Sequence, residues 1–253
     1  MKGQNDRIPL IYAHRGASGY EVDNTITAFD LAIEQGADGL ESDVYLTTDG
    51  IPYLYHDSMI QVEREGEIKE VKPDSIHSDE FEAVVLDENE TVPTVEDFFQ
   101  KYGGEKAHSG KLLKFSFDFQ LNTTESVAKL AKKYSCEDQL YMCAKWGTYF
   151  KKIRDISTKV HLVGSNSIRP LTFQTFQKDW SKYQKYGIEI FNIKAEDFKP
   201  KYIPKLTKAG FKYYIWDLHD EERLRKYLPY KPFGIYSNYP DLALEIRQEL
   251  FGE

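Results

Sequence analysis

The stretch PLIYAHRGASGYEVDNTITAFDLAIEQGADGLESDVY, at residues 9–45, contains an alternation that favours one class of fold. The apolar run at 9–14 predicts a buried strand. Apolar residues recur at helical spacing through 24–35, which predicts an amphipathic helix. The run at 39–45 predicts a second strand. A strand, a helix and a strand in such close succession are typical of an α/β protein.

The same alternation continues along the chain, and the first helix has Asp23 or Asn24 as its predicted cap and Gly36 as its predicted end. Further strands are predicted at 51–56, 112–119, 139–144, 159–164, 188–193, 211–216 and 233–236. Further helices are predicted at 95–102, 125–134, 201–209 and 221–227. About eight such units over about 250 residues predict a (β/α)8 TIM barrel. A doubly wound open sheet is the alternative, but no Gly-x-Gly-x-x-Gly motif follows the first strand.

Residues 57–93 interrupt this alternation. Their segment 61–68 is polar, and no clear helix leads from it back to a strand. Loops of this length are usually functional or mobile. We therefore expect one barrel domain over residues 1–253, with a small insertion after the third strand at about 57–93.

Composition restricts the classes of function. The chain has 253 residues, with 33 Lys and Arg against 41 Asp and Glu, so its formal net charge is −8. A hydrophobic share of 41% is typical of a globular protein rather than a disordered one. The acidic balance argues against nucleic acid as a partner. We expect no stable membrane insertion, because no apolar run approaches the roughly 20 residues of a membrane helix.

The opening residues and the cysteines add two smaller expectations. Residues 1–7 are polar and lack the pattern of a signal peptide, so a cytoplasmic location is the default expectation. Cys136 and Cys143 fit neither a disulfide framework nor a metal-binding spacing.

Several predicted strands end in ionisable groups, which is where barrel enzymes place catalytic groups. Glu41 and Asp43 are two positions apart on one strand, so both side chains leave the same face. Two carboxylates that face a barrel interior are costly alone. A divalent cation removes that cost, and oxygen ligands suit Mg²⁺ or Ca²⁺. The alternative is a pair of solvated carboxylates on an edge strand.

The predicted strand at 112–120 alternates aromatic and polar residues. Period two places its phenylalanines on one face, toward the helices, and its polar groups on the other, toward the barrel interior. Asp118 then points toward Glu41 and Asp43 and can complete a site of three carboxylates. An ordinary amphipathic edge strand is the alternative.

Two histidines stand at strand ends beside charged neighbours. Asp49-Gly50 is a hairpin signal, and a two-residue loop there would place Asp43 opposite His56, with Cβ atoms roughly 5 Å apart. A slip of one residue would send His56 to the other face. His14 ends the first strand. The remaining histidines are expected to be structural or on the surface: His77, His108, His161 and His219.

Arg15 follows His14 and offers a planar fork of donors for an anionic oxygen, most plausibly a phosphate. Two histidines, an arginine and a divalent cation suit the cleavage of a phosphodiester. The cation and Arg15 neutralise the phosphoryl oxygens. One imidazole removes a proton from the attacking oxygen, and the other protonates the leaving alkoxide.

The order and spacing of these motifs resemble the glycerophosphodiester phosphodiesterase family. The match is most specific over residues 8–57 and looser beyond them, where Trp216 and the run 234–240 are similar to the closing strands of the family. The matching motifs are His14-Arg15-Gly16, Asp23-Asn24-Thr25, Gly36-Ala37-Asp38, Glu41-Ser42-Asp43-Val44, Thr48-Asp49-Gly50, His56-Asp57 and Val92-Pro93-Thr94-Val95-Glu96.

The resemblance implies a barrel enzyme that cleaves glycerophosphodiesters to glycerol 3-phosphate and an alcohol with the help of a divalent metal ion. It implies that the glycerol 2-hydroxyl attacks to form a cyclic phosphate, which water then opens. The implied roles are catalysis by His14 and His56, metal binding by Glu41 and Asp43, phosphate contact by Arg15, and a pocket wall at Trp216. For Trp216 an ordinary core position is the equal alternative.

The chain departs from the family pattern where a Glu-x-Lys motif would stand, because it has Asp118-Phe119-Gln120. Asp118 keeps the charge on a shorter arm, whereas Gln120 removes a cation from the phosphate. Lys145 could supply the missing charge, although most lysines are solvated surface groups. The closing Thr-Asp-x-Pro of the family is Ser237-Asn238-Tyr239-Pro240 here.

Three functions are compatible with these residues. The first is a metal-dependent phosphodiesterase with a small glycerophosphodiester substrate. The second is a lysophospholipase D or cyclase with a lipid substrate, which needs an apolar mouth that Tyr20, Trp146 and the insertion could build. The third is a phosphate-binding protein that has lost turnover, which the departures at Asp118 and Gln120 motivate.

Overall fold

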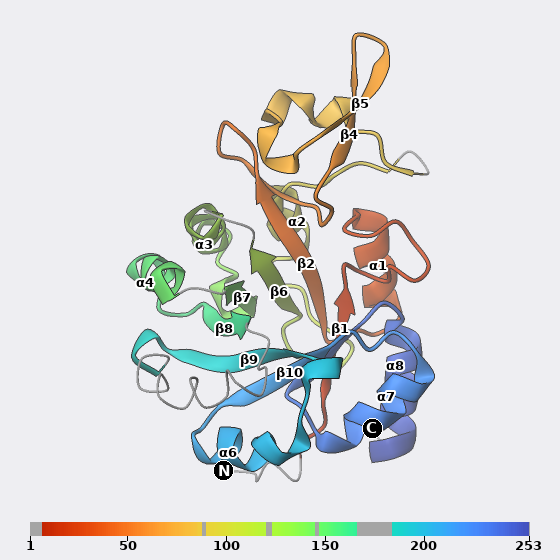
Figure 1. Cartoon of the computed structure of the whole chain (residues 1–253), viewed down its shortest axis with the longest axis vertical. Coiled ribbons are helices and arrows are strands. Elements are labelled where there is room, and N and C mark those ends of the chain that lie inside the picture. Colours follow the sequence, from red (N-terminus) through yellow and green to blue (C-terminus); the bar gives the residue numbers. More distant parts are fainter. Residues whose placement is uncertain (1–6, 88–89, 120–122, 145–146, 166–183, 253) are drawn as a thin grey trace.

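The computed structural model describes residues 7–87, 90–119, 123–144, 147–165 and 184–252. Eight parallel strands of this part form a closed barrel, because β1 pairs with β11 on one side and with β2 on the other (Figure 1). This closure excludes the open-sheet alternative. The barrel strands are β1 (Leu10–His14), β2 (Gly39–Leu46), β6 (Lys114–Phe119), β7 (Leu140–Ala144), β8 (His161–Ser165), β9 (Ile188–Lys194), β10 (Lys212–Trp216) and β11 (Gly234–Ser237).

Helices surround this barrel on its outer side (Figure 1). The described helices are α1 (Ile26–Glu34), α2 (Val95–Tyr102), α3 (Thr124–Lys133), α4 (Gly147–Ile156), α6 (Ile203–Lys208), α7 (Glu221–Tyr227) and α8 (Pro240–Phe251). None of them, within the described ranges, has the length and apolar character needed to cross a bilayer.

The sequence predicted each barrel strand to within about two residues of its observed ends. It did not single out α4 or α8. The predicted cap of α1 was wrong, because the side chain of Thr25, rather than that of Asp23 or Asn24, accepts the N–H of Ala28. Gly36 follows the helix with φ +95°, a left-handed conformation that suits glycine.

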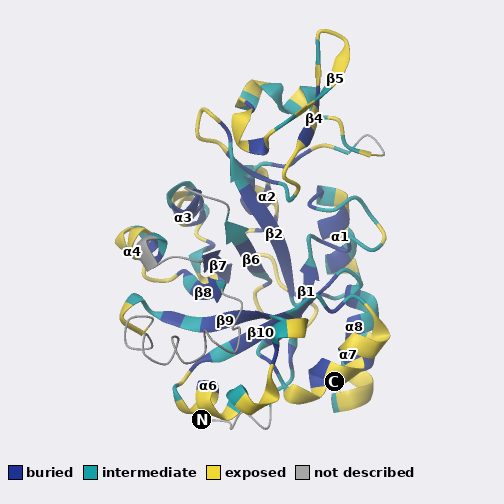
Figure 2. Cartoon of the chain, viewed as in Figure 1, coloured by how far each residue is buried: buried dark blue, intermediate teal, exposed yellow. Residues whose placement is uncertain are grey.

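The barrel interior is filled mostly by tyrosines. Tyr12, Tyr214 and Tyr236 are fully or almost fully buried, and the hydroxyls of Tyr12 and Tyr214 are 2.9 Å apart. Gly39 makes room for this layer, since a Cβ on it would lie 2.6 Å from the Tyr12 ring. The larger core lies between strands and helices, where the buried residues concentrate (Figure 2).

The alternation on β6 divides between these two cores as expected. Phe115 and Phe117 face outward and pack on the α2 ring of Phe98, with centroid separations of 5.0 and 5.2 Å. Ser116, between them, faces inward and hydrogen-bonds the hydroxyl of Tyr236. The aromatic face therefore fixes β6 against α2 and leaves its polar face to the barrel interior.

The third predicted strand is β3 (Pro52–Leu54), which pairs antiparallel with β2 outside the barrel. The predicted register was wrong by one residue: Tyr45 pairs with Tyr53, so the backbone N–H of Tyr55, not that of His56, bonds to the carbonyl of Asp43. The cause is a three-residue loop with Gly50 at φ +91° in place of the two-residue loop.

The insertion follows β3 and projects from one end of the barrel (Figure 1). It contains the antiparallel pair β4 (Ile60–Arg64) and β5 (Glu67–Val71), and the short 3-10 helices η2 (Pro73–Ser75) and η3 (Ser78–Ala83). Tyr53, Ile60 and Ile76 belong to a small apolar cluster of its own. The insertion thus packs on the β2–β3 hairpin rather than on the barrel core.

Replacing Phe98 with alanine tests the core between β6 and α2. We expect Phe98→Ala to lower the free energy of unfolding by about 3–5 kcal/mol, the usual cost of truncating a buried aromatic residue. Denaturant unfolding measures this loss. The exposed Ile68→Ala serves as the control and should cost less than about 0.5 kcal/mol. A loss below about 1 kcal/mol for Phe98→Ala would contradict the described packing.

Candidate active site

The polar end of the barrel is organised where the chain leaves β1. His14 is in register with Glu41 on β2, and the backbone N–H of Arg15 donates to both the carbonyl and the Oε2 atom of Glu41, at 2.9 and 3.2 Å. The chain then turns sharply, since Arg15 and Gly16 have φ values of +59° and +82°. A Cβ on Gly16 would lie 2.7 Å from Ala28, so the turn packs directly on α1.

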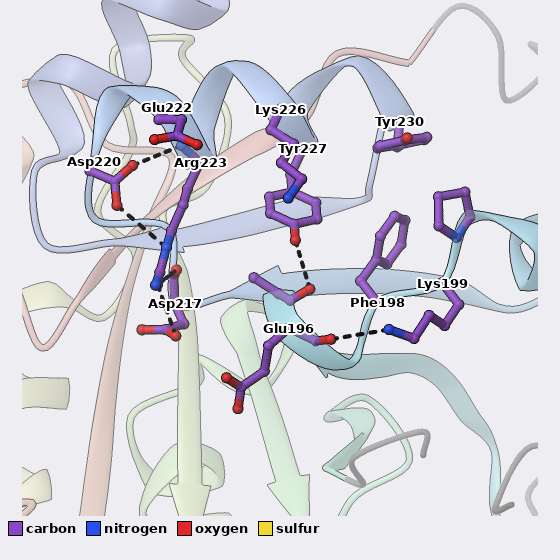
Figure 3. Close-up of a pocket in the computed structure, with 12 residues that line it drawn as sticks. Glu196, Phe198, Lys199, Asp217, Asp220, Glu222, Arg223, Lys226, Tyr227 and Tyr230 are labelled. Carbon is purple, nitrogen blue, oxygen red and sulfur yellow. Dashed lines mark hydrogen bonds and ion pairs between the residues drawn. The ribbon is translucent and has the colours of Figure 1, made fainter. Parts of the chain in front are cut away.

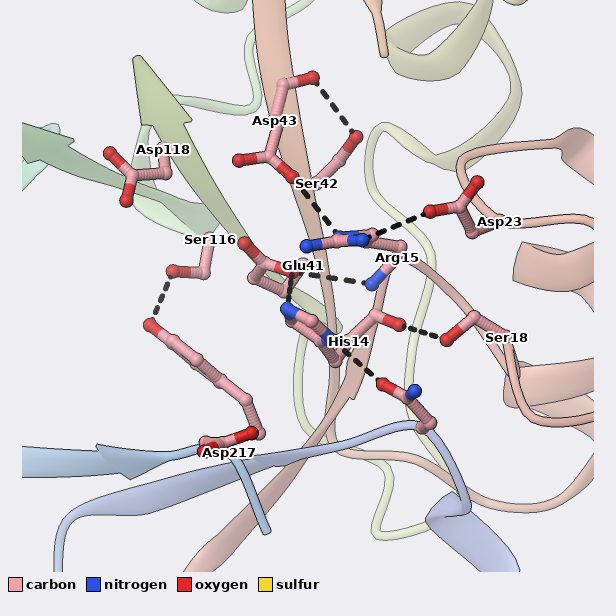
Figure 4. Close-up of polar contacts among 12 residues, drawn as sticks. His14, Arg15, Ser18, Asp23, Glu41, Ser42, Asp43, Ser116, Asp118 and Asp217 are labelled. Carbon is pink, nitrogen blue, oxygen red and sulfur yellow. Dashed lines mark hydrogen bonds and ion pairs between the residues drawn. The ribbon is translucent and has the colours of Figure 1, made fainter. Parts of the chain in front are cut away.

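Arg15 lies between carboxylates of two elements (Figure 4). Its Nη1 atom is 3.2 Å from Oδ2 of Asp23, and its Nε atom is 3.3 Å from Oδ2 of Asp43. The second contact lacks hydrogen-bond geometry, so Arg15 Nε and Asp43 Oδ2 are both buried without a hydrogen-bond partner. A buried donor and a buried acceptor left unused side by side are costly unless a ligand engages them.

Glu41 and Asp43 bring two negative charges into the barrel mouth. They are 5% and 8% exposed. Burial raises the pKa of Glu41 well above its ordinary value, and the nearby Asp43 raises it further. Burial also raises the pKa of Asp43, although Arg15 opposes that shift. The positive charge of Arg15 therefore compensates the carboxylates of the mouth only in part.

Asp118 on β6 stands next to Asp43 in the strand register, and its charge contributes to the raised pKa of Glu41. Ser165 donates a hydrogen bond to Asp118 at 3.3 Å. In the described ranges, no three His, Cys, Asp or Glu side chains are grouped closely enough to hold a metal ion by themselves. The unused Oδ2 of Asp43 and the hard oxygen donors of Glu41 still fit a divalent cation, since Mg²⁺ keeps several waters as ligands.

Both ring nitrogens of His14 have a neighbour that fixes the orientation of the ring. Its Nδ1–H donates to Oδ1 of Asn238 at 2.7 Å, because an amide oxygen can only accept. The other ring nitrogen, Nε2, lies 3.8 Å from Oε2 of Glu41. Burial lowers the pKa of His14 to about 3, and the charge of Arg15 adds to this shift. The imidazole is therefore neutral near pH 7, with its Nε2 lone pair facing the site.

His219, which the sequence suggested to be structural or on the surface, is a site residue that the sequence analysis missed. Its ring stacks on His14 with centroids 5.2 Å apart and planes inclined by 27°. Its Nδ1 accepts the N–H of Asn238 at 3.1 Å, and its Nε2 lies 3.4 Å from Oδ1 of Asp217. The signal was available, since these residues follow the carboxyl ends of β10 and β11.

His56 reaches the same region despite the wrong register. It is close enough for its charge to lower the pKa of both Asp43 and His14. Its Nδ1 lies 2.8 Å from Oδ1 of Asp57, and its side chain is 39% exposed, against 12% for His14. One histidine is thus enclosed in the barrel mouth, and the other is open to solvent.

Of the remaining predicted site residues, the structure describes only Trp216. Trp216 ends β10 and packs against the inner tyrosine cluster, with the Lys194 ammonium 5.6 Å from its ring centroid. Gln120 and Lys145 lie outside the described residues. His14, Arg15, Asp118 and Trp216 lie at or near the carboxyl ends of their barrel strands, Glu41 and Asp43 lie within β2, and His56 follows the antiparallel β3.

Fold and site together define a class of protein: a (β/α)8 barrel whose mouth combines buried carboxylates, an arginine and imidazoles, groups suited to an anionic substrate and a cation. A sequence model of the glycerophosphoryl diester phosphodiesterase family matches residues 14–242. The chain belongs to this family, and it is an enzyme of the glycerophosphodiester phosphodiesterase type.

Individual relatives agree with this assignment. The chain is 24% identical over 250 residues to the glycerophosphodiester phosphodiesterase of Caldanaerobacter subterraneus, covering 94% of this chain and 97% of the relative. The solved glycerophosphodiester phosphodiesterase of Thermotoga maritima superposes with a TM-score of 0.72 at 19% identity, covering 94% and 98%. An Oleispira antarctica phosphodiesterase, solved with its product sn-glycerol-3-phosphate, gives a TM-score of 0.76 at 19% identity, covering 94% and 96%.

The protonation of His14 tests this geometry. We expect its ring signals in NMR spectra of the metal-free protein to stay constant from about pH 5 to 8, because a pKa lowered to about 3 leaves the ring neutral throughout that range. Asn238→Asp places a carboxylate on Nδ1 and should raise this pKa by at least about one unit.

The His14 signal is assigned by its loss in His14→Gln. A wild-type titration centred near the ordinary value of 6.5 would contradict the described burial, as would an unchanged His14 pKa in Asn238→Asp.

Proposed function

We propose that the chain hydrolyses glycerophosphodiesters to glycerol 3-phosphate and an alcohol, with a divalent cation and with His14 and His56 as base and acid. The observation that carries the proposal is the unused pair of buried atoms, Arg15 Nε and Asp43 Oδ2, beside a neutral His14. A phosphate oxygen satisfies the first atom and a cation the second. The relative that was solved with sn-glycerol-3-phosphate supports the choice of product.

Glu41, Asp43 and Asp118 would hold the cation, which is Mg²⁺ or Ca²⁺. Bound there, it would neutralise substrate oxygens and favour ionisation of a substrate hydroxyl. The carboxylates have a further effect on the fold itself, because their charges repel one another across β2 and β6 until a cation compensates them. Arg15 would bind a phosphate oxygen through its guanidinium.

His14 is the general base of this proposal. Its Nε2 is unprotonated at neutral pH and takes the proton from the attacking oxygen, the 2-hydroxyl of the glycerol moiety, which a bound cation would make more acidic. The alcohol leaves as the cyclic phosphate forms, and water then opens the cyclic phosphate to glycerol 3-phosphate. Asn238 and His219 are positioning residues, since the amide oxygen of Asn238 fixes the proton on Nδ1 and the ring of His219 holds the plane of His14. Neither of them needs to touch the substrate.

His56 is the general acid, because the leaving alcohol must depart toward solvent and His56 is the histidine on the open side. Asp57 accepts a hydrogen bond from its Nδ1, which orients the ring and leaves Nε2 as the nitrogen that donates the proton. Trp216, Gln120 and Lys145 complete the proposal as substrate-binding residues. Lys145 would supply the positive charge that Gln120 does not.

Turnover assays test this function directly. Glycerophosphodiesters should release glycerol 3-phosphate with Mg²⁺ or Ca²⁺ present, and chelation should abolish the release. His14→Ala and His56→Ala should each lower kcat by about 10²–10⁴, the usual contribution of a positioned acid or base.

The exposed His108 is the matched control, and His108→Ala should keep the wild-type kcat. Unchanged turnover in either His14→Ala or His56→Ala would refute the assigned roles. Metal and glycerol phosphate binding without turnover of any diester would instead identify a binding protein, and release restricted to lysophosphatidylcholine would identify a lipid-directed enzyme.

A further inference from the structure

A cavity of about 830 Å³ opens beside the barrel mouth, between the loop after β1 and the insertion. His56 and Asp57 form part of its wall, together with Asp23 from the β1 loop and Glu70 from β5. The proposed general acid, which is open to solvent, therefore also borders this space.

The charged side chains in the wall of this cavity are predominantly negative. Among the residues that the structure describes, its lining includes the carboxylates Asp23, Asp57, Glu70 and Asp87 and no lysine or arginine. Asp23 is paired with Arg15, and Asp57 is bonded to His56. Glu70 and Asp87, by contrast, have no ion-pair partner among the residues that the structure describes. Two uncompensated negative charges thus face the space beyond the reacting phosphate.

Two aromatic rings form another part of the wall. These rings belong to Tyr45, near the end of β2, and Tyr55, just after β3. Their centroids are 6.5 Å apart, and their planes are inclined by 54°. Burial raises the pKa of Tyr55 to about 12, and the charges of Asp57 and Asp23 contribute, which places those carboxylates near its hydroxyl. Aromatic faces next to carboxylates are a recognised environment for ammonium groups.

We propose that this cavity is the subsite for the leaving alcohol, and that it selects alcohols that carry an ammonium group over neutral or anionic ones. The proposal rests on the proposed phosphodiesterase function. Tyr45 and Tyr55 contact the methyl or methylene groups next to the nitrogen, and Glu70 and Asp87 supply the counter-charge. The insertion, which contributes Glu70 and Asp87, thereby sets the substrate preference of the barrel enzyme.

A second cavity shows why the first one is distinctive. It has a volume of about 670 Å³ and lies over the ends of β9 and β10, against α7 (Figure 3). There Arg223 is 3.0 Å from Asp217 and 3.4 Å from Asp220, and Lys199 and Lys226 are also in the wall. Its positive and negative charges largely compensate one another, so it presents no comparable field to an ammonium group.

The experiment compares four diesters with the metal-loaded enzyme: glycerophosphocholine, glycerophosphoethanolamine, glycerophosphoglycerol and glycerophosphoinositol. We expect kcat/KM for the two cationic alcohols to exceed that for the two neutral ones by about tenfold or more, and the ratio to shrink at high salt because exposed charges are screened. The double variant Glu70→Gln/Asp87→Asn should reduce this ratio toward one and leave glycerophosphoglycerol turnover within about twofold.

Glu67→Gln is the control, since it also removes a negative charge from β5. Glu67 does not line the cavity, and its side chain leaves the opposite face of the strand from that of Glu70. It should keep the wild-type ratio. Equal turnover of cationic and neutral diesters by the wild type, or a double variant that behaves like Glu67→Gln, would overturn the subsite while leaving the phosphodiesterase function intact. No turnover of any of the four diesters would overturn both.

Tetramethylammonium tests ammonium binding in the cavity directly, because it has no phosphodiester bond to be cleaved. It should inhibit glycerophosphocholine hydrolysis competitively in the wild type and in Tyr55→Phe, which keeps the ring, and about tenfold more weakly in Tyr55→Leu. Equal inhibition of Tyr55→Leu and Tyr55→Phe would overturn the aromatic part of the subsite.

Discussion

The contact between Arg15 and the carboxylates of Asp43 and Asp23 is the interaction on which the site depends. It brings the turn after β1 against β2 and places a fixed positive charge between the buried Asp43 and the partly exposed Asp23. The compensation is incomplete, because one arginine faces Asp23, Glu41 and Asp43 together. In the function proposed above, a cation would compensate the excess negative charge of the carboxylates, and Arg15 would neutralise a phosphate oxygen.

The backbone around this contact is strained in a way that ordinary packing does not require. Arg15, Asn24 and Asp217 all have φ between +59° and +73°, a region that non-glycine residues rarely adopt. Each is held by specific partners: Arg15 by Glu41, Asn24 by the hydroxyl of Ser42, and Asp217 by Arg223. Left-handed residues held by several contacts are characteristic of sites where geometry is fixed in advance of binding.

Much of this could be predicted from sequence because it depends on local periodicity. The period of two on β2 placed Glu41 and Asp43 on one face, and the same rule placed Asp118 inside while Phe115 and Phe117 met α2. The position of His56 required a loop geometry as well, and the sequence does not distinguish a two-residue turn from a three-residue loop at Asp49-Gly50.

Other features depend on how the barrel closes, which no local pattern encodes. His219 and Asn238 are more than 200 residues from His14 in sequence, and they meet it only because β11 pairs with β1. The cavity beside His56 depends similarly on where the insertion folds back over Tyr45 and Tyr55. The family resemblance named residues that the structure brings together at the barrel mouth. The contacts of His14 with Asn238 and His219, and the cavity beside His56, are visible only in the three-dimensional structure.

Thermal unfolding of the metal-free and metal-loaded protein tests the central claim, that uncompensated carboxylates are held in the mouth for a cation. Saturating Mg²⁺ or Ca²⁺ should stabilise the wild type by about 2.7 kcal/mol at 100 times Kd. Glu41→Gln should melt above the metal-free wild type and gain little from either cation. Because burial raises the pKa of Glu41, this advantage should appear as pH rises above the ordinary value of 4.5 and vanish below it. A wild type indifferent to both cations, with Glu41→Gln no more stable than it at neutral pH, would contradict the account.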